Sequence, residues 1–170
     1  MKTLRNLMYT AAVAVLFAGC AGKDGAPGAQ GPQGATGNAN VQAFDYSPTA
    51  ADWVNVPATT ANTQWETSAA ISALTSTIVN TGGVEAFVSF DNGVSFTGLG
   101  ESYEGTEYNW GYAAGNVTFY QTLDNGAVFT PITANLMYKI VLIPAAVMHQ
   151  HPNTNWKDYN NVKSVLNLRD

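Results

Sequence analysis

The chain is poor in the residues that most often carry chemistry. Its 170 residues include one cysteine and two histidines, and only 11% of them are charged. A single cysteine, Cys20, excludes a disulfide within the chain, so packing alone must hold the fold. The sequence also lacks a G-x-S-x-G elbow and an S-x-x-K motif, which are local patterns of nucleophilic enzymes. We therefore expect no catalytic residues and no enzymatic activity.

Positive charge is also scarce. Seven basic residues stand against twelve acidic ones, and the chain contains no cluster of Lys or Arg. Proteins that bind nucleic acids need basic side chains that neutralise phosphates. The composition therefore predicts that nucleic acid is not a partner.

The N-terminal hydrophobic run is too short for a transmembrane helix. The apolar stretch, residues 7–18, falls short of the roughly 20 residues that cross a bilayer. It follows Lys2 and Arg5 and precedes Gly19 and Cys20, which is the arrangement of an export signal. We expect residues 1–19 to be a signal peptide, with an N-terminal signal helix that is removed.

The end of this signal carries a short motif. Phe17-Ala18-Gly19-Cys20 resembles the lipobox of bacterial lipoproteins. The resemblance implies that the Cys20 thiol receives a diacylglycerol and that cleavage follows Gly19. Several acyl chains on one residue anchor a protein stably, because each buried methylene contributes about 0.8 kcal/mol. The membrane is then a partner through this lipid. The alternative is an ordinary secretory signal with an incidental cysteine.

The residues after Cys20 bear on the destination. Ala21 stands where some bacteria read an aspartate as a mark for inner-membrane retention, which favours the outer membrane. Lys23-Asp24 loosely resembles the charged signals that send some lipoproteins to the cell surface. We expect a protein of the bacterial cell envelope, held at the outer membrane and facing either the periplasm or the exterior.

Glycine then recurs at every third position. It occupies positions 22, 25, 28, 31, 34 and 37, with two prolines among the residues between them. Only glycine fits the crowded axis of a collagen triple helix, so the period is typical of collagen. Residues 20–39 are predicted to be a lipid-anchored, collagen-like spacer, either an extended Gly-rich stalk or a triple helix within a homotrimer. Extended at about 3.1 Å per residue, the stalk would reach roughly 55 Å.

Residues 40–170 are predicted to form one β-rich globular domain. β-branched and aromatic residues occur there in short runs broken by turn residues, which is typical of strands. Asp-Asn-Gly at 91–93 and at 124–126 predicts two similar hairpins. The run 138–143 is apolar at nearly every position and predicts a strand buried on both faces, ended by Pro144. The expected strands are 41–46, 65–69, 84–90, 95–99, 117–123, 128–129 and 138–143.

Helical spacing occurs at two places. Apolar residues recur at intervals of three and four within 71–78, which predicts a short helix. They do so again near the C-terminus and predict a helix at about 156–168, with Asn155 and Asp158 as its capping arrangement. The expected fold class is all-β, a β-sandwich or a jelly-roll-like domain, with this short C-terminal helix.

Several short motifs together resemble a group of small collagen-like lipoproteins of the Bacteroidota. The resemblance spans nearly the whole chain and includes the glycine stalk. Its motifs are Gly37-Asn38-Ala39-Asn40-Val41, Asn80-Thr81-Gly82-Gly83-Val84, Tyr138-Lys139-Ile140-Val141-Leu142-Ile143-Pro144 and Asp158-Tyr159-x-x-Val162. It implies a lipid-anchored β-rich domain on a stalk. Because the group has no assigned activity, the resemblance implies no catalytic residue.

The segment 101–112 mixes aromatic and acidic residues. Aromatic rings can stack on sugars while carboxylates accept hydroxyl protons, and such rings are common at binding sites. If this segment binds glycans, its rings must line one exposed groove; a structural loop is the alternative. The candidate glycan-binding residues are Tyr103, Tyr108, Trp110 and Tyr112, among Glu101, Glu104 and Glu107.

His149 and His151 are the only histidines, and on an extended segment they would share a face. A zinc site needs three or four ligands, and no nearby carboxylate completes the set. We therefore expect an exposed loop after Pro144. The two Asp-Asn-Gly turns are interpreted as hairpin turns rather than calcium sites. The sequence predicts no metal and no cofactor.

Two functions remain open. The first is a lipid-anchored module that presents a structural or interaction domain to a partner protein or to components of the envelope. The second is a glycan-binding accessory lipoprotein that uses the segment 101–112.

Overall fold

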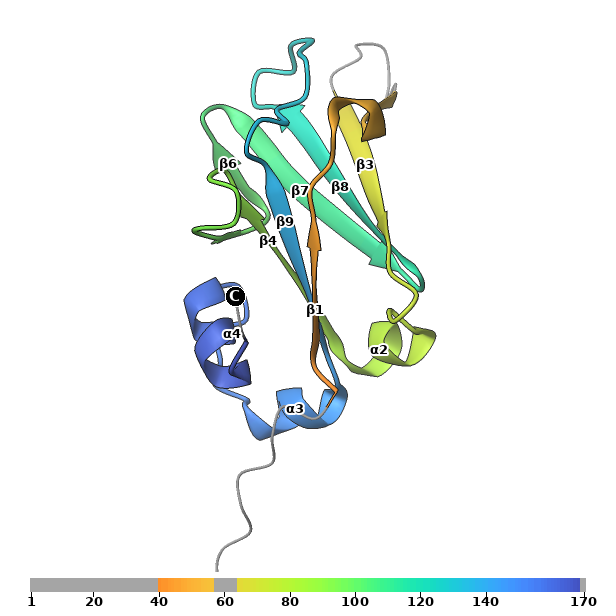
Figure 1. The fold of residues 1–170 in the computed structure, drawn as a ribbon, viewed down its shortest axis with the longest axis vertical. Helices are drawn as coiled ribbons and strands as arrows, with labels where there is room; N and C mark the ends of the chain where they lie inside the picture. Colours follow the sequence, from red (N-terminus) through yellow and green to blue (C-terminus); the bar gives the residue numbers. More distant parts are fainter. Residues whose placement is uncertain (1–39, 57–63, 169–170) are drawn as a thin grey trace, which may run out of the picture. The chain divides into compact units, whose positions relative to one another are not determined.

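The computed structural model describes residues 40–56 and 64–168, all within one unit, Thr36–Asp170 (Figure 1). The signal peptide, Gly19, Cys20 and the glycine spacer lie outside the described residues. The expectations for them therefore stay predictions.

The described residues are mostly β-strands in two antiparallel sheets with a few short helices, which confirms the prediction of a β-rich fold. The four-stranded sheet has the order β1 (Gln42–Tyr46), β9 (Met137–Ile143), β4 (Gly83–Ser89) and β5 (Thr97–Gly98). The five-stranded sheet has the order β2 (Val54–Val56), β3 (Gln64–Ala70), β8 (Asn116–Leu123), β7 (Thr106–Ala113) and β6 (Glu101–Tyr103).

The inner faces of the two sheets share one core. Phe119 of β8 and Tyr138 of β9 are fully buried, and their rings stack with centroids 3.9 Å apart. Tyr46 of β1 lies against both rings, at 6.0 Å from Phe119 and 6.4 Å from Tyr138, and its hydroxyl bonds to Thr67 of β3. These rings come from both sheets, so the aromatic stack joins one sheet to the other.

Strand β9 is buried on both faces, as its sequence predicts. Tyr138, Ile140 and Leu142 belong to the core between the sheets. Val141 and Ile143 point the other way, because side chains alternate along a strand, and they belong to a second apolar cluster. Pro144 ends the strand and precedes α3.

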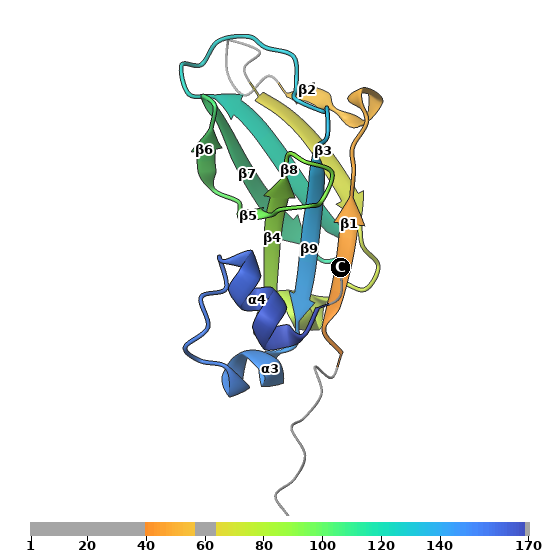
Figure 2. The same ribbon diagram turned by 60° about the vertical axis from the view of Figure 1, so that its left-hand side comes forward.

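The second cluster is closed by two helices, α3 (Ala145–Gln150) and α4 (Tyr159–Leu166). Figure 2 shows both helices beside β4 and β9. Val162 and Leu166 of α4 are fully buried in this cluster, together with Phe87 of β4. The helices therefore cover the outer face of the four-stranded sheet.

The C-terminal helix is shorter than predicted and starts at Tyr159. Its N-cap is Asp158, whose carboxylate accepts hydrogen bonds from the backbone N–H groups of Asn160 and Asn161. Asn155 is not the cap. Its side-chain oxygen accepts instead from the backbone N–H of Lys157, within the turn before the helix.

The predicted helix at 71–78 is also shifted. The structure has α2 at Ser76–Thr81, and the buried residues Ile71 and Leu74 precede it. The Thr75 hydroxyl caps the helix by accepting from the backbone N–H of Ile78. Ile71 and Leu74 have helix-like spacing because both are buried in the segment before the helix, and neither belongs to the helix. A single 3-10 turn, η2 (Ala50–Asp52), lies between β1 and β2.

The first predicted hairpin forms, with a two-residue return strand. β4 pairs with β5 through Phe87 opposite Gly98 and Val88 opposite Thr97. The turn contains Asn92 at φ 60°, a conformation that Asn tolerates better than most residues.

The second predicted hairpin is wrong. Residues 124–136 contain no strand, although 128–129 were expected to pair with β8. Strand β8 is already flanked by β3 and β7, so a returning strand has no free edge to pair with. The segment is held instead by the buried Gln121, whose amide donates to the Ile132 carbonyl and accepts from the Ile132 N–H, both at 2.8 Å.

Candidate binding surface

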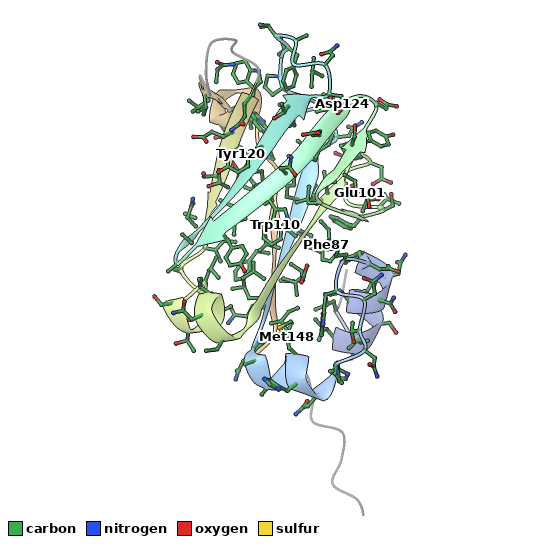
Figure 3. The ribbon with its side chains drawn as sticks, turned by 180° about the vertical axis from the view of Figure 1, so that it is seen from behind. Phe87, Glu101, Trp110, Tyr120, Asp124 and Met148 are labelled. Carbon is green, nitrogen blue, oxygen red and sulfur yellow. The ribbon has the colours of Figure 1, made fainter. Side chains whose placement is uncertain are left out.

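The outer faces of the two sheets differ. The helices α3 and α4 cover β4 and β9 of the four-stranded sheet, whereas no helix of the described residues crosses the outer face of β7 and β8, as the view from behind shows (Figure 3). Burial along β8 alternates strictly in its first six residues, with Val117, Phe119 and Gln121 fully buried. The residues between them therefore point outward, away from the core.

The segment 101–112 is not a loop, so the structural-loop alternative is wrong. It forms β6 and most of β7, joined by a tight turn in which Glu104 and Gly105 have φ values of 50° and 80°. Positive φ at both central residues is typical of the two-residue hairpin turns whose backbone twist matches that of the flanking strands. Tyr103 and Thr106 pair directly across it.

The predicted glycan-binding rings do not line one groove. Tyr108 points inward and is only 2% exposed, so its ring is unavailable to a ligand. Its burial, with a smaller contribution from the Glu104 charge, raises the Tyr108 pKa to about 12. Tyr103 is 47% exposed and stacks on Phe90, with centroids 4.4 Å apart.

Trp110 and Tyr112 form a separate pair. Their rings lie 5.4 Å apart and nearly parallel, and Tyr112 is 43% exposed. Trp110 also packs against the core between the sheets. The structure thus brings Trp110 and Tyr112 together, pairs Tyr103 with Phe90 instead, and buries Tyr108.

The outer face of the five-stranded sheet presents residues that the sequence analysis missed. We define the outer face as the outward side chains of β3, β8 and β7. Its central row places Glu66 opposite Tyr120 and Tyr120 opposite Asn109. The next row places Ser68 opposite Thr118 and Thr118 opposite Gly111. The alternation of 117–123 was the sequence signal that could have identified Tyr120 as outward-facing.

Several polar groups on the outer face are unengaged. Glu66, Glu107, Asn109 and Tyr120 make no hydrogen bond or ion pair among the residues described. Thr118, in contrast, bonds to the Ser68 hydroxyl at 3.1 Å and accepts from the Asn116 amide at 3.1 Å. The carboxylates can accept hydrogen bonds from a partner, and the amide and the phenol can both donate and accept them.

Charge is distributed unevenly between the sheets. The strands β3, β6 and β7 and their turns carry only acidic side chains in the part of the chain that the structure describes. The described lysines all lie on β9, on α4 or just before it, and Lys139 pairs with Asp45 at 2.8 Å. Of the acidic side chains of this sheet, Glu66 and Glu107 point outward, Glu101 lies on the same side of β6 as Tyr108 does on β7, and Glu104 and Asp124 lie in turns.

The four-stranded sheet carries a perturbed carboxyl on its covered side. Glu85 of β4 is half-buried, and this burial raises its pKa to about 7, against a smaller opposing effect of the Lys157 charge. A hollow of about 340 Å³ lies near the start of α4 and is bordered by Phe96, Lys157 and Tyr159. The Lys157 carbonyl comes so close to Gly98 that a side chain there would clash, so β5 packs directly on the segment before α4.

The histidines lie at the end of α3. His149 is exposed in its last turn and His151 is the C-cap, so the predicted loop is a short helix. Over residues 40–56 and 64–168, no three His, Cys, Asp or Glu side chains come together as a possible metal site.

Comparison of the chain with protein-family models, with curated proteins and with solved structures finds no match. Within the described residues, none of the helices has the length and apolar character needed to cross a membrane.

Proposed function

We propose that this protein is a bacterial envelope lipoprotein, anchored at the outer membrane by a lipid on Cys20, that presents a β-sandwich interaction domain on a collagen-like stalk. The contact surface is the outer face of the five-stranded sheet. The observation that supports this choice is the difference in cover: α3 and α4 pack on one sheet, and the other keeps an open face with unengaged polar side chains.

The position of the stalk in the sequence fits this proposal. The glycine repeat ends at Gly37, and β1 begins only five residues later, at Gln42. Strand β1 is at the edge of its sheet and pairs with β9 alone. A short connection into an edge strand suits a domain that is anchored through its N-terminal end. The proposed function requires no catalytic residue, metal or cofactor.

The anchor is tested with the full chain expressed in a Gram-negative host that is fed an alkyne-tagged palmitate. We expect the tag on the wild-type chain and none on Cys20→Ser, because the thioether requires the thiol. Gly22→Ala, two residues away, serves as the control and should keep the tag. A tagged Cys20→Ser chain, or an untagged wild type, contradicts the lipid anchor.

The contact surface is tested by binding of the purified chain from Ala21 onward, which carries no lipid anchor, to isolated envelopes of the source cells. Thr118→Arg places a long charged side chain in the middle of the outer face, and we expect binding to fall at least tenfold. Asn160→Arg, on the exposed side of α4, should bind like the wild type. Equal binding by the two variants overturns the choice of this face.

The state of the stalk is a separate question. Sedimentation of the chain from Ala21 onward, with and without residues 22–37, distinguishes an extended single stalk from a homotrimeric triple helix. A trimer that becomes a monomer on deletion supports the triple helix, whereas monomers in both cases support the simple spacer.

The four predicted rings of 101–112 do not share one groove, so a glycan site that uses all of them is not proposed. A smaller site formed by Trp110 and Tyr112 alone is a second candidate. The observation that favours it is the parallel ring pair with one exposed member, since paired aromatic faces can stack on sugar rings. A glycan array probed with the wild type and with Tyr112→Ala tests it. Loss of every signal in the variant supports this site, and an unchanged array rejects it.

A further inference from the structure

We infer that the outer face of the five-stranded sheet binds a neutral glycan chain, with the Tyr120 ring as its stacking platform. This inference rests on the proposed function, because it names the chemistry of the partner for that same face. It differs from the second candidate, since Trp110 and Tyr112 point to the inner side of β7 and Tyr120 points outward from β8.

The first argument is the shape of the face around Tyr120. Its direct neighbours across the strands are Glu66 and Asn109. Diagonally beside it lies Gly111, where a side chain would meet nothing within 4 Å. Neighbouring strands lie about 4.8 Å apart, so the Glu66–Tyr120–Asn109 row extends over about 10 Å. The Tyr120 ring is half-buried, and the space above Gly111 beside it leaves room for a sugar ring.

The second argument is the hydrogen-bonding capacity of the same row. The Glu66 carboxylate, the Asn109 amide and the Tyr120 hydroxyl have no partner among the described residues. Sugar hydroxyls both donate and accept hydrogen bonds, so they match a carboxylate that only accepts and an amide that does both. Aromatic rings that combine an apolar face with a polar end suit a partner that is itself part apolar and part polar.

The third argument is charge. Glu66 and Glu107 are the ionisable side chains of the outer face, and no Lys or Arg joins them among the residues that the structure describes. A surface with carboxylates of one sign repels polyanions. Sulfated, phosphorylated or uronate-rich chains are therefore disfavoured, and a neutral glycan remains.

The fourth argument separates a glycan from a protein partner. Protein interfaces have an apolar centre and a polar rim. Here the centre is polar, apart from the Tyr120 ring, and the outward-pointing side chains of β3, β8 and β7 include no aliphatic group larger than Ala. The larger outward residues, Val54 and Val56, lie on the edge strand β2. This arrangement is the reverse of a protein-binding patch.

The test uses the full chain captured in lipid vesicles on a biosensor. The probes are hexasaccharides of β-1,4-linked glucose, xylose, mannose and N-acetylglucosamine, with oligogalacturonate as the anionic probe. We expect at least one neutral probe to bind and the anionic probe not to bind. Tyr120→Ala should lower the affinity for the neutral probe at least tenfold. Tyr120→Phe should keep that affinity within about threefold of the wild-type value, because the ring remains.

Two further variants protect the test against misfolding and misassignment. Gly111→Val narrows the open area beside the ring, its Cβ meets no atom within 4 Å, and it should also lower affinity at least tenfold. Asn160→Arg, on the exposed side of α4, should bind like the wild type. The inference is overturned if no neutral probe binds, if the anionic probe binds more tightly, or if Tyr120→Ala and Gly111→Val both leave affinity unchanged.

Failure here is distinguishable from failure of the proposed function. If Thr118→Arg abolishes binding to envelopes while no neutral hexasaccharide binds, the face is an interaction surface for another chemistry. If Thr118→Arg leaves envelope binding intact, the proposed function itself fails.

Discussion

In the four-stranded sheet, the central strands β4 and β9 are buried on both faces, whereas the described residues of the five-stranded sheet are buried mainly on the inner face. Their central strands show the difference in sequence: β9 is apolar at most positions, and β8 alternates between apolar and polar. A strand covered on both sides reads as a continuous hydrophobic run, and a half-buried strand reads as an alternation. The comparison teaches that the helices stabilise one sheet on its outer side, while the outward side chains of β7 and β8 are not covered by any helix of the described residues.

The largest expected effect comes from breaking the core that both sheets share. Phe119→Ala removes a fully buried ring that stacks on Tyr138, and we expect a loss of about 3–5 kcal/mol in the free energy of unfolding. The adjacent Thr118→Ala acts on the open side of the same strand and should change stability by about 0.5 kcal/mol or less. Denaturant unfolding of both variants measures the contrast, and similar losses would show that the outer side of β8 is covered after all.

A smaller loss is expected where only the covered sheet is touched. Leu166→Ala removes a buried side chain from the inward side of α4, which should lower the free energy of unfolding by about 2–3 kcal/mol. Asn160→Ala, on the exposed side of the same helix, is the control and should be nearly neutral. If the packing of α3 and α4 does not affect the outer face of the other sheet, the Leu166→Ala protein should still bind envelopes when it is assayed below its unfolding temperature. Loss of that binding in the folded variant argues against the separation.

The smallest effect is a pH dependence that belongs to the covered sheet. Burial raises the Glu85 pKa from 4.5 to about 7, so the folded state holds the proton more tightly than the unfolded chain. Stability is therefore lost as pH rises through this range, and Glu85→Gln removes the loss. At pH 8 we expect Glu85→Gln to raise the free energy of unfolding by about 1–2 kcal/mol, after allowance for solvent screening of a half-buried group. The variant should therefore unfold at a higher temperature than the wild type at that pH. At pH 4 it should match the wild type, and a difference there of the same size contradicts this assignment.

The sequence predicted the covered sheet better than the open one. Strand β9 was recognisable because its apolar run is continuous and Pro144 ends it. Strand β7 was missed because its inward residues, among them Tyr108 and Trp110, were interpreted as a cluster of binding rings. The second hairpin was wrong because pairing depends on which edges are free. One edge of β8 is taken by β7, which directly precedes it, and the other is taken by β3 from a distant part of the chain.

The candidate surface shows the same limit. That Tyr120 points outward follows from the alternation of β8, and this was readable from the sequence. That its face stays open depends on where α3 and α4 dock, which is decided by tertiary packing on β4 and β9. Local pattern predicts the face of a strand, but not what covers it.

Hydroxyl-radical footprinting of Tyr120, read by mass spectrometry on the full chain in intact cells and on the purified chain, tests the binding role of the open face most directly. The account predicts that Tyr120 is oxidised in the purified chain and protected in the envelope, while Tyr112 is oxidised equally in both. Equal oxidation of Tyr120 in the two preparations would contradict the account.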